Sequence, residues 1–397
     1  MKNLKMIITL FILIIIYLYV ANITLIPNQI ILLENENYKI KKFIGVDTIE
    51  TVSTSTDNGN TLNVDVTLFG QKVKEVTIDT IENLEVVPIG KIIGLKLYTN
   101  GVLIVGMSEI ENMENKLVSP FEGCNIQEGD TIVKVNETEI ETIDNLKNVV
   151  NNSNGENVLL TLVRDGTIVT SNITPAQTES DEYKLGLWVK DAATGVGTIT
   201  YYEKNTGNFA ALGHGIVDSD TDKLIDIDSG EVVTSDVMAI TKADINSPGE
   251  IRGTIINQKT IGEVQKNTKF GIYGILDNLA SLNIDTTKAM PVALRSEIKV
   301  GDAKLLCSLD GKNNQEYHIK IEKIYENNSY DNKSMLIRVT DKELIEKTGG
   351  IIRGLSGSPI LQNGKFVGAV TNVLVSNPEI GYAIFGDMMI KEMRTVN

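Results

Sequence analysis

The chain has two histidines, and their surroundings differ. His318 belongs to YHIKIE (residues 317–322), where apolar and polar residues alternate, so a strand would turn His318 toward solvent. His214 belongs to ALGHGIVD (residues 211–218), where a glycine on each side lets the backbone turn sharply and approach another group closely. An imidazole held in this way can act as a general base, although a structural histidine in a glycine turn fits the same pattern.

The segment GLSGSP (residues 354–359) has the shape of the chymotrypsin-like nucleophile loop G-x-S-G-G-P. Gly354 lets its own N–H and that of Ser356 converge on a developing oxyanion, and Gly357 leaves room for a substrate carbonyl. Ser358 stands in place of the second glycine, so Ser356 is the expected nucleophile. A tight turn without chemistry would explain the loop alone. Together with His214 it predicts a serine that attacks a peptide bond.

The composition excludes several other classes of function. The net charge of −15 argues against a nucleic-acid partner, because phosphate binding needs clustered Lys and Arg. Cys124 and Cys307 are expected to be free and buried, since a disulfide framework needs more cysteines at closer spacing. Neither has a CxxC neighbour, and with two histidines no zinc-site pattern arises. We therefore expect no metal and no cofactor.

The N-terminus has the pattern of a membrane anchor. Lys2 and Lys5 precede an almost wholly apolar run over residues 6–26, about 20 residues, which is long enough to span a bilayer core. These lysines, and the glutamates after the run, place the N-terminus in the cytoplasm and the rest outside. A cleaved signal peptide is the alternative, but no small-residue A-x-A site ends the run. We expect a transmembrane anchor over residues 1–27 and a β-rich spacer over residues 28–94, with residues 62–68 as a half-buried strand.

Residues 95–176 are expected to form a small α+β domain. Asn100-Gly101 between two apolar runs predicts a hairpin, Thr142 can cap a helix, and Asp165-Gly166 marks a second hairpin. Residues 96–175 resemble a bacterial PDZ domain, and the most specific part of the resemblance lies in SPFEGCNIQEGDTIVKVNETEI (residues 119–140). That resemblance implies that an extended peptide adds as a strand beside a helix, for which the candidate residues are Val102, Leu103, Ile104 and Val105. A small domain without a ligand is the alternative.

Residues 177–397 predict an all-β domain. After the polar linker AQTESDEY (residues 176–183), β-branched residues and glycine-containing turns dominate. Strands are expected over residues 195–202, 253–264, 303–307, 317–324, 335–339, 366–375 and 382–385. The expected fold is therefore mainly β: a transmembrane helix, a PDZ-like α+β domain and a C-terminal chymotrypsin-like β-barrel serine peptidase domain.

This organisation resembles the SpoIVB peptidase family of spore-forming bacteria. Three stretches carry the resemblance: LGLWVKDAATGVGTITYYE (185–203) with ALGHGIVD, SPGEIRGTI (247–255), and TGGIIRGLSGSPILQNGKFVGAV (348–370). The resemblance implies a serine endopeptidase, exported between the forespore and mother-cell membranes, that cleaves itself and a membrane-associated regulatory protein during sporulation signalling. His214 and Ser356 occupy the positions of its histidine and serine, and Asp341 that of its acid. Asn372 departs from the family, in which a histidine is often expected there.

For the acid that would orient His214, the spacing of the residues and the family resemblance favour different candidates. The order His214, Asp341, Ser356 is that of chymotrypsin, but there the acid lies much farther upstream of the serine. Asp244, Asp277 and Asp285 are therefore rivals, and a helix N-cap is a second interpretation of Asp341.

Two functions remain open from the sequence. The first is a membrane-anchored serine endopeptidase with a protein substrate, a peptide held by the PDZ-like domain, and no nucleic acid. The second is a catalytically silent PDZ adaptor tethered to the membrane. HtrA-type proteases also join a peptidase to PDZ domains, but with the peptidase first.

Overall fold

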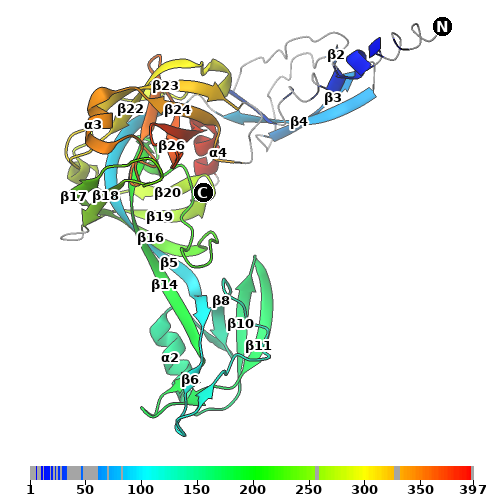
Figure 1. The fold of residues 1–397 in the computed structure, drawn as a ribbon, viewed down its shortest axis with the longest axis vertical. Helices are drawn as coiled ribbons and strands as arrows, with labels where there is room; N and C mark the ends of the chain where they lie inside the picture. Colours follow the sequence, from blue (N-terminus) through cyan, green and yellow to red (C-terminus); the bar gives the residue numbers. More distant parts are fainter. Residues whose placement is uncertain are drawn as a thin grey trace.

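The structure is a computed structural model that describes residues 84–254, 259–325 and 331–394 throughout, and parts of the chain before residue 84. Figure 1 shows two β-barrels forming the upper body, with an α+β unit projecting below them on strands β5 and β14. The chain is mainly β, as the sequence predicts. Near the N-terminus, β1 (Gln29–Leu33), β4 (Gln71–Ile81), β3 (Thr61–Leu68) and β2 (Val46–Asp47) make a separate four-stranded sheet.

Two unusually long strands organise the rest of the fold. β5 (Glu85–Met107) and β14 (Leu187–Tyr202) pair antiparallel, from Leu187 opposite Met107 to Tyr202 opposite Val87. Most consecutive residues of β5 are buried, as expected of a strand that is covered on both faces. One half of the pair belongs to the first barrel and the other half to the α+β unit.

The first barrel is a ring of six strands. β5 and β14 are joined by β15 (Asn208–Ala211), β20 (Gly271–Leu276), β19 (Thr260–Thr268) and β16 (Ile227–Thr234), and β16 pairs with β5 to close the ring. Its core consists mainly of aliphatic side chains, among them Ile93, Leu95, Leu97 and Ile272, together with the rings of Phe209 and Tyr202. Closure of this kind leaves no unpaired sheet edge inside the ring.

The second barrel is also closed. Its strands run in the order β22 (Gly301–Cys307), β23 (Gln315–Ile324), β24 (Met335–Val339), β27 (Ile380–Phe385), β26 (Lys365–Val373) and β25 (Pro359–Gln362). Helices α3 (Lys342–Thr348) and α4 (Gly386–Arg394) follow β24 and β27. Five of the seven strands expected after residue 177 match within a few residues, whereas the one expected over residues 253–264 is divided between two elements.

The α+β unit has its own core. β8 (Thr131–Val135), β10 (Val158–Arg164) and β11 (Thr167–Ile173) extend the sheet beyond β5, and α2 (Ile143–Asn152) packs on it. Thr142 caps α2 as predicted, accepting a hydrogen bond from the Asn145 N–H at 3.1 Å. The hairpin of β10 and β11 is confirmed as well.

The remaining elements are short. They are β6 (Ile110–Glu111), β7 (Leu117–Val118), β9 (Thr138–Glu139), β12 (Ala176–Gln177), β13 (Tyr183–Lys184), β17 (Asp236–Thr241), β18 (Glu250–Thr254), β21 (Met290–Pro291), and the 3₁₀ turns η1 (Leu279–Leu282) and η2 (Arg295–Glu297).

The prediction of a hairpin at Asn100-Gly101 is wrong. β5 runs straight through these residues, and Gly101 has a φ of 105°. Up to Thr99 the outer edge of β5 pairs with β16, and from Val102 onward it pairs with β8. The glycine is needed because a Cβ there would lie 2.5 Å from the Ile132 carbonyl oxygen. An expected domain boundary at residue 95 therefore falls inside a continuous strand.

The two barrels are held together by buried contacts. Tyr201 and Phe366 meet edge to face with ring centroids 5.3 Å apart. Arg295 and Asp387 form an ion pair at 3.0 Å with side chains that are 8% and 0% exposed, which ties the connection between the barrels to α4. A buried pair of this kind cannot lose one partner without leaving an uncompensated charge.

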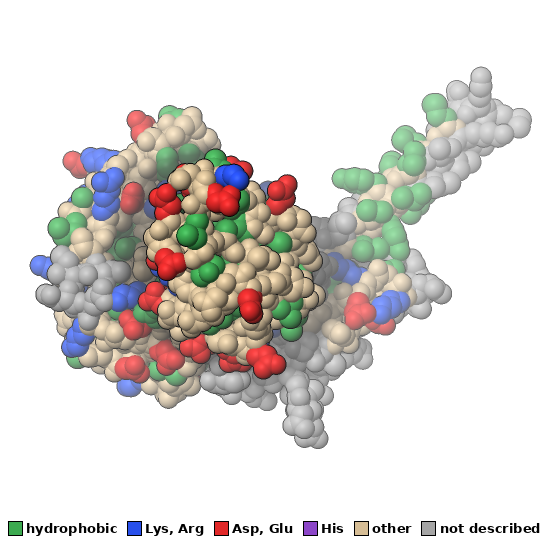
Figure 2. All heavy atoms as spheres, turned by 90° about the horizontal axis from the view of Figure 1, so that it is seen from below, with side chains coloured by type: hydrophobic (Ala, Val, Ile, Leu, Met, Phe, Trp, Pro, Cys, Tyr) green, Lys and Arg blue, Asp and Glu red, His purple; other side chains and the backbone are tan. Residues whose placement is uncertain are grey.

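The anchor expected over residues 1–27 falls largely outside the described residues. Among those that are described, no helix reaches the length and apolar character needed to cross a bilayer. Several described residues between 6 and 20 are helical and leave large apolar side chains exposed, such as Leu10, Phe11 and Tyr17 (Figure 2).

Candidate functional site

A cavity of about 760 Å³ lies between the two barrels and contains both His214 and Ser356. His214 comes from the loop after β15 in the first barrel, and Ser356 from the loop before β25 in the second. The cavity is also lined by Gly354, Asn372, Asp222, Lys269, Arg353, Asn332 and several aliphatic side chains. Two residues about 140 positions apart, singled out by their glycine neighbours, are thus brought to one place.

The His214 loop has a backbone that few sequences could adopt. Leu212 and Gly213 both have positive φ, 70° and 69°. A leucine in this region is strained, as is common at functional sites. Gly215 is required for another reason, because a Cβ there would lie 2.5 Å from the Thr268 carbonyl oxygen.

The protonation state of His214 follows from its contacts. Nδ1 lies 2.9 Å from the Gly215 carbonyl oxygen, which can only accept, so Nδ1 carries the proton and Nε2 is the free base. Desolvation lowers the pKa of His214 below 6.5, and the hydrogen bond to Gly215 opposes this only in part. The neutral form required of a general base is therefore favoured.

In the Ser356 loop, consecutive carbonyl groups are hydrogen-bonded, but alternate N–H groups are not. The carbonyls of Arg353, Gly354, Leu355 and Ser356 accept hydrogen bonds from Ile251 N, Thr198 Oγ1, Ser358 N and Thr198 N. Across the described hydrogen bonds, neither the N–H of Gly354 nor that of Ser356 has an acceptor. These are the two donors that the sequence assigns to an oxyanion hole.

Glycine at 354 and 357 is needed for the shape of the loop. Gly354 has a φ of 98° and Gly357 of 95°. A Cβ at 357 would lie 2.2 Å from the Thr198 carbonyl oxygen. The space that we assigned to a substrate carbonyl is therefore occupied by the β14 backbone, and that detail of the prediction is wrong.

The Ser356 hydroxyl donates to the Thr371 carbonyl oxygen at 2.8 Å. No hydrogen bond between Ser356 and His214 is recorded in the described part of the chain. Ser358 is fully buried and outside the cavity, which agrees with the choice of Ser356. Asn372 lines the same cavity as His214 and Ser356.

Asp341 does not lie beside His214, which corrects the expectation taken from the resemblance. Its Oδ1 accepts hydrogen bonds from Glu343 N at 3.0 Å and Leu344 N at 3.2 Å, so it caps α3. Its Oδ2 accepts the N–H of His318 at 3.1 Å. Burial works to raise the pKa of Asp341, but these backbone donors outweigh it and lower the pKa. The geometry is that of the alternative, the helix cap.

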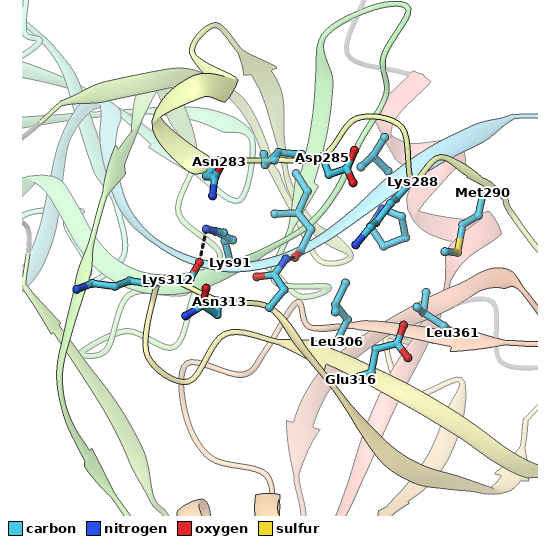
Figure 3. A pocket seen from close by; sticks show the side chains of 15 residues that line it. Lys91, Asn283, Asp285, Lys288, Met290, Leu306, Lys312, Asn313, Glu316 and Leu361 are labelled. Carbon is cyan, nitrogen blue, oxygen red and sulfur yellow. Dashed lines mark hydrogen bonds between the residues drawn. The ribbon is translucent and has the colours of Figure 1, made fainter.

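The rival acids do not reach His214 either. Asp244 accepts a hydrogen bond from Ile245 N, and Asp285 accepts two from Thr287. Asp285 lines a different cavity of about 440 Å³, where it lies with Lys288 and the buried Lys91 (Figure 3). Asp277 lines neither cavity. The carboxylate that does line the His214 cavity is Asp222, which sequence reasoning missed.

Asn267 is a second residue that the sequence did not reveal. Its Oδ1 accepts the Ile216 N–H at 2.9 Å, and its Nδ2 donates to the carbonyls of Ile216 and Ile225 at 2.9 and 2.8 Å. The amide therefore fixes the chain two residues after His214. No motif marks it, because its partners lie on the loop between β15 and β16.

The prediction that β5 residues bind a peptide is wrong. Val102 and Leu103 pair with β8 on one edge, while Leu103 and Ile104 pair with β14 on the other, so a peptide strand has no free edge to join. A groove of about 440 Å³ lies instead between α2 and the start of β14. It is lined by Ile143, Leu146, Val150, Leu185, Leu187 and Val189, with others. Val105 does not line it.

His318 and Cys307 are placed as expected, whereas Cys124 is only partly buried. His318 is exposed on β23. Cys124 and Cys307 are both free, and burial raises the pKa of Cys307 to about 12. A thiol in that state is not a nucleophile near neutral pH.

A double barrel with a histidine from one barrel and a serine from the other defines a serine-peptidase type of protein. The family model described as SpoIVB peptidase S55 matches residues 181–390, slightly more than half of the chain. The chain belongs to this family of peptidases, as the resemblance implies. A comparison with curated proteins found no match.

Solved structures of proteases are similar to part of the chain. One is the HtrA-type protease AlgW with decapeptide, at 15% identity and a TM-score of 0.31, covering 54% of this chain and 54% of the other. Another is the Rv3671c protease from M. tuberculosis in its active form, at 14% identity and a TM-score of 0.31, covering 52% and 75%. The chain thus spans about half the length of the HtrA-type protease.

The two interpretations of Asp341 predict different effects of substitution. As a helix cap, Asp341→Asn should leave the free energy of unfolding nearly unchanged, and Asp341→Ala should lower it by about 1 kcal/mol. Because the carboxylate touches α3 and not His214, we expect Asp341→Asn to keep most turnover. Urea unfolding and turnover measured on both variants check this. Loss of turnover in Asp341→Asn at unchanged stability would restore the triad assignment.

The lowered pKa of His214 predicts how stability varies with pH. The unfolded chain binds the proton first, so the contribution of His214 to stability is complete above pH 6.5 and is lost as the pH falls toward the folded pKa. The stability advantage of the wild type over His214→Gln should therefore shrink between about pH 7.5 and about pH 5.5. An advantage that grows on acidification would mean that the folded pKa is raised instead.

Proposed function

We propose that the chain is an active serine endopeptidase in which Ser356 is the nucleophile and His214 the general base. The observation that carries this is the shared cavity, in which His214 and Ser356 meet from opposite barrels. The unbonded N–H groups of Gly354 and Ser356 support it, because they are free to receive a developing negative charge. The composition of the loop alone would not distinguish an active site from a turn.

The reaction begins with a rotation of the serine. The Ser356 hydroxyl leaves the Thr371 carbonyl and turns to Nε2 of His214. It attacks the substrate carbonyl while Nε2 takes its proton, and the oxyanion is held by the N–H groups of Gly354 and Ser356. His214 then gives the proton to the leaving amine, and water repeats the sequence to release the acyl group.

The imidazolium that forms is supported by the Gly215 carbonyl. Its contact with Nδ1 at 2.9 Å fixes the ring and the tautomer, which are two tasks of the acid in a Ser-His-Asp site. A neutral carbonyl stabilises the positive charge less than a carboxylate does. The site therefore works as a pair of side chains with a backbone orienter.

The location of the substrate follows from the proposed anchor. Lysines precede an apolar segment, and its described residues expose apolar side chains, which supports insertion in a membrane with residues 38–397 outside. The family suggests cleavage of the chain itself and of a membrane-associated regulatory protein during sporulation, in the space between the forespore and mother-cell membranes. A tethered enzyme meets such substrates at high effective concentration.

Removal of the nucleophile tests both parts of this proposal. Ser356→Ala should abolish turnover and labelling by a fluorophosphonate probe, and should remain full length in the membrane fraction where the wild type is trimmed. His214→Gln should lose turnover to a similar extent because the two act as one unit, whereas His318→Gln should not. Absence of labelling in a folded wild type would favour the silent adaptor. Trimming of Ser356→Ala would mean that another protease releases the chain.

We propose further that the groove beside α2 binds an extended apolar peptide. Between Leu187 and Lys190, β14 pairs with β5 on one edge, and the described pairings give it no strand on the other. A peptide can add there as a strand while its side chains contact Leu146 and Val150 of α2. This relocates the PDZ-like binding expected on β5.

A charge in the groove tests this binding. In a Ser356→Ala background, Leu187→Asp should weaken binding of a fluorescein-labelled valine-rich peptide at least about tenfold, since an apolar peptide that covers this half-buried position would strip water from the new carboxylate. Ile168→Asp is the matched control, because Ile168 is exposed on β11 of the same unit and outside the groove. Equal anisotropy titrations for the two variants would exclude the groove.

A further inference from the structure

Thr198 of β14 is a fully buried polar residue that touches both loops of the site. Its hydroxyl donates to the Gly354 carbonyl oxygen at 2.6 Å, and its N–H donates to the Ser356 carbonyl oxygen at 3.2 Å. Its own carbonyl accepts the N–H of Leu212 at 3.1 Å, two residues before His214. One residue thus holds the nucleophile loop and the base loop at the same time.

We propose that the Thr198 hydroxyl is a positioning group that sets the oxyanion hole. This rests on the proposed function of Ser356 and His214. The peptide group between Gly354 and Leu355 lies between the two oxyanion donors in the chain, and the hydroxyl is what holds its carbonyl. The N–H of the same peptide group donates to the Ile352 carbonyl oxygen at 3.1 Å, so this bond and the hydroxyl together fix the direction of the Gly354 N–H relative to the Ser356 N–H.

The glycine makes this restraint necessary. Gly354 has a φ of 98° and no side chain to limit its rotation. The carbonyls of Arg353, Leu355 and Ser356 are bonded to backbone N–H groups, which any residue supplies. The carbonyl of Gly354 is bonded to a side chain, so this one restraint can be removed by substitution while the others stay.

The chain offers a matched control in Thr200. Thr198 and Thr200 are both fully buried on β14, but the hydroxyl of Thr200 has no hydrogen-bond partner among the described residues. Thr→Val keeps the shape and removes the hydroxyl at either position. The two substitutions therefore differ in the bond to Gly354.

The expected loss is moderate and falls on the chemical step. Thr198→Val should lower kcat about tenfold, the equivalent of one neutral hydrogen bond, which is less than the ~10²–10³ for loss of an oxyanion donor itself. KM should stay within about twofold, because the substrate ground state does not use the oxyanion donors. The rate of fluorophosphonate labelling should fall in parallel, since the phosphonyl oxygen occupies the same hole.

The test compares four variants for kcat, KM, labelling rate and thermal stability. Thr198→Val and Thr198→Ala should be slow, Thr198→Ser should recover most of the rate, and Thr200→Val should equal the wild type. If Thr198→Val does not fold, the contrast between Ala and Ser decides. Wild-type rates in Thr198→Ala or Thr198→Val, or a slow Thr198→Ser, would overturn the inference.

Failure of this inference is distinguishable from failure of the proposed function. If the wild type is not labelled and has no turnover that depends on Ser356, the proposed peptidase function is contradicted. A wild type that depends on Ser356 while all Thr198 variants match it would remove only the positioning role. Equal slowing by Thr198→Val and Thr200→Val would point to general packing and would also overturn it.

Discussion

The continuous pairing of β5 with β14 is the constraint on which the rest of the structure depends. One end of the pair forms a wall of the groove in the α+β unit, and the other end contributes two neighbouring strands to the first barrel. In both pairings of β14 the register shifts between Ile199 and Tyr201, next to Thr198, which contacts the loops that carry His214 and Ser356. Bulges of this kind aim backbone groups next to active sites. A one-residue slip would move Thr198 to the wrong face and separate it from both loops.

The chemistry also depends on how the two barrels meet, because each supplies half of the site. Gly357 packs its backbone directly against Thr198 and Leu212, which brings the serine loop onto the first barrel. Behind this contact, Tyr201 packs on Phe366, and the buried pair of Arg295 and Asp387 joins the interbarrel connection to α4. Burying an ion pair adds little net stability. The fixed geometry that this ion pair requires instead favours one arrangement of the two barrels.

The sequence could reveal features whose cause is local. Strand alternation, the Thr142 cap and the glycine-framed His214 and Ser356 all follow from neighbouring residues, and they are found where expected. The error at Asn100-Gly101 shows the limit. A glycine with positive φ is required there, but by an exchange of strand partners from β16 to β8, which no dipeptide can report. The peptide-binding residues on β5 failed for the same reason, since both of their edges are filled by distant strands.

Asp341 shows a different limit. From the sequence, its position just before α3 fits both a helix cap and a member of a catalytic triad. The three backbone N–H groups that donate to its carboxylate identify it as a helix cap. The same holds for the site as a whole, which is built mostly from main-chain contacts. Contacts between backbone groups can be predicted from the sequence only through the glycines that allow a close approach. The sequence therefore indicated the glycines of the site but not the groups that they contact. Two side chains, the Thr198 hydroxyl and the Asn267 amide, complete this framework, each by bonding to backbone. They resemble any buried threonine or asparagine until the loops they hold are placed beside them.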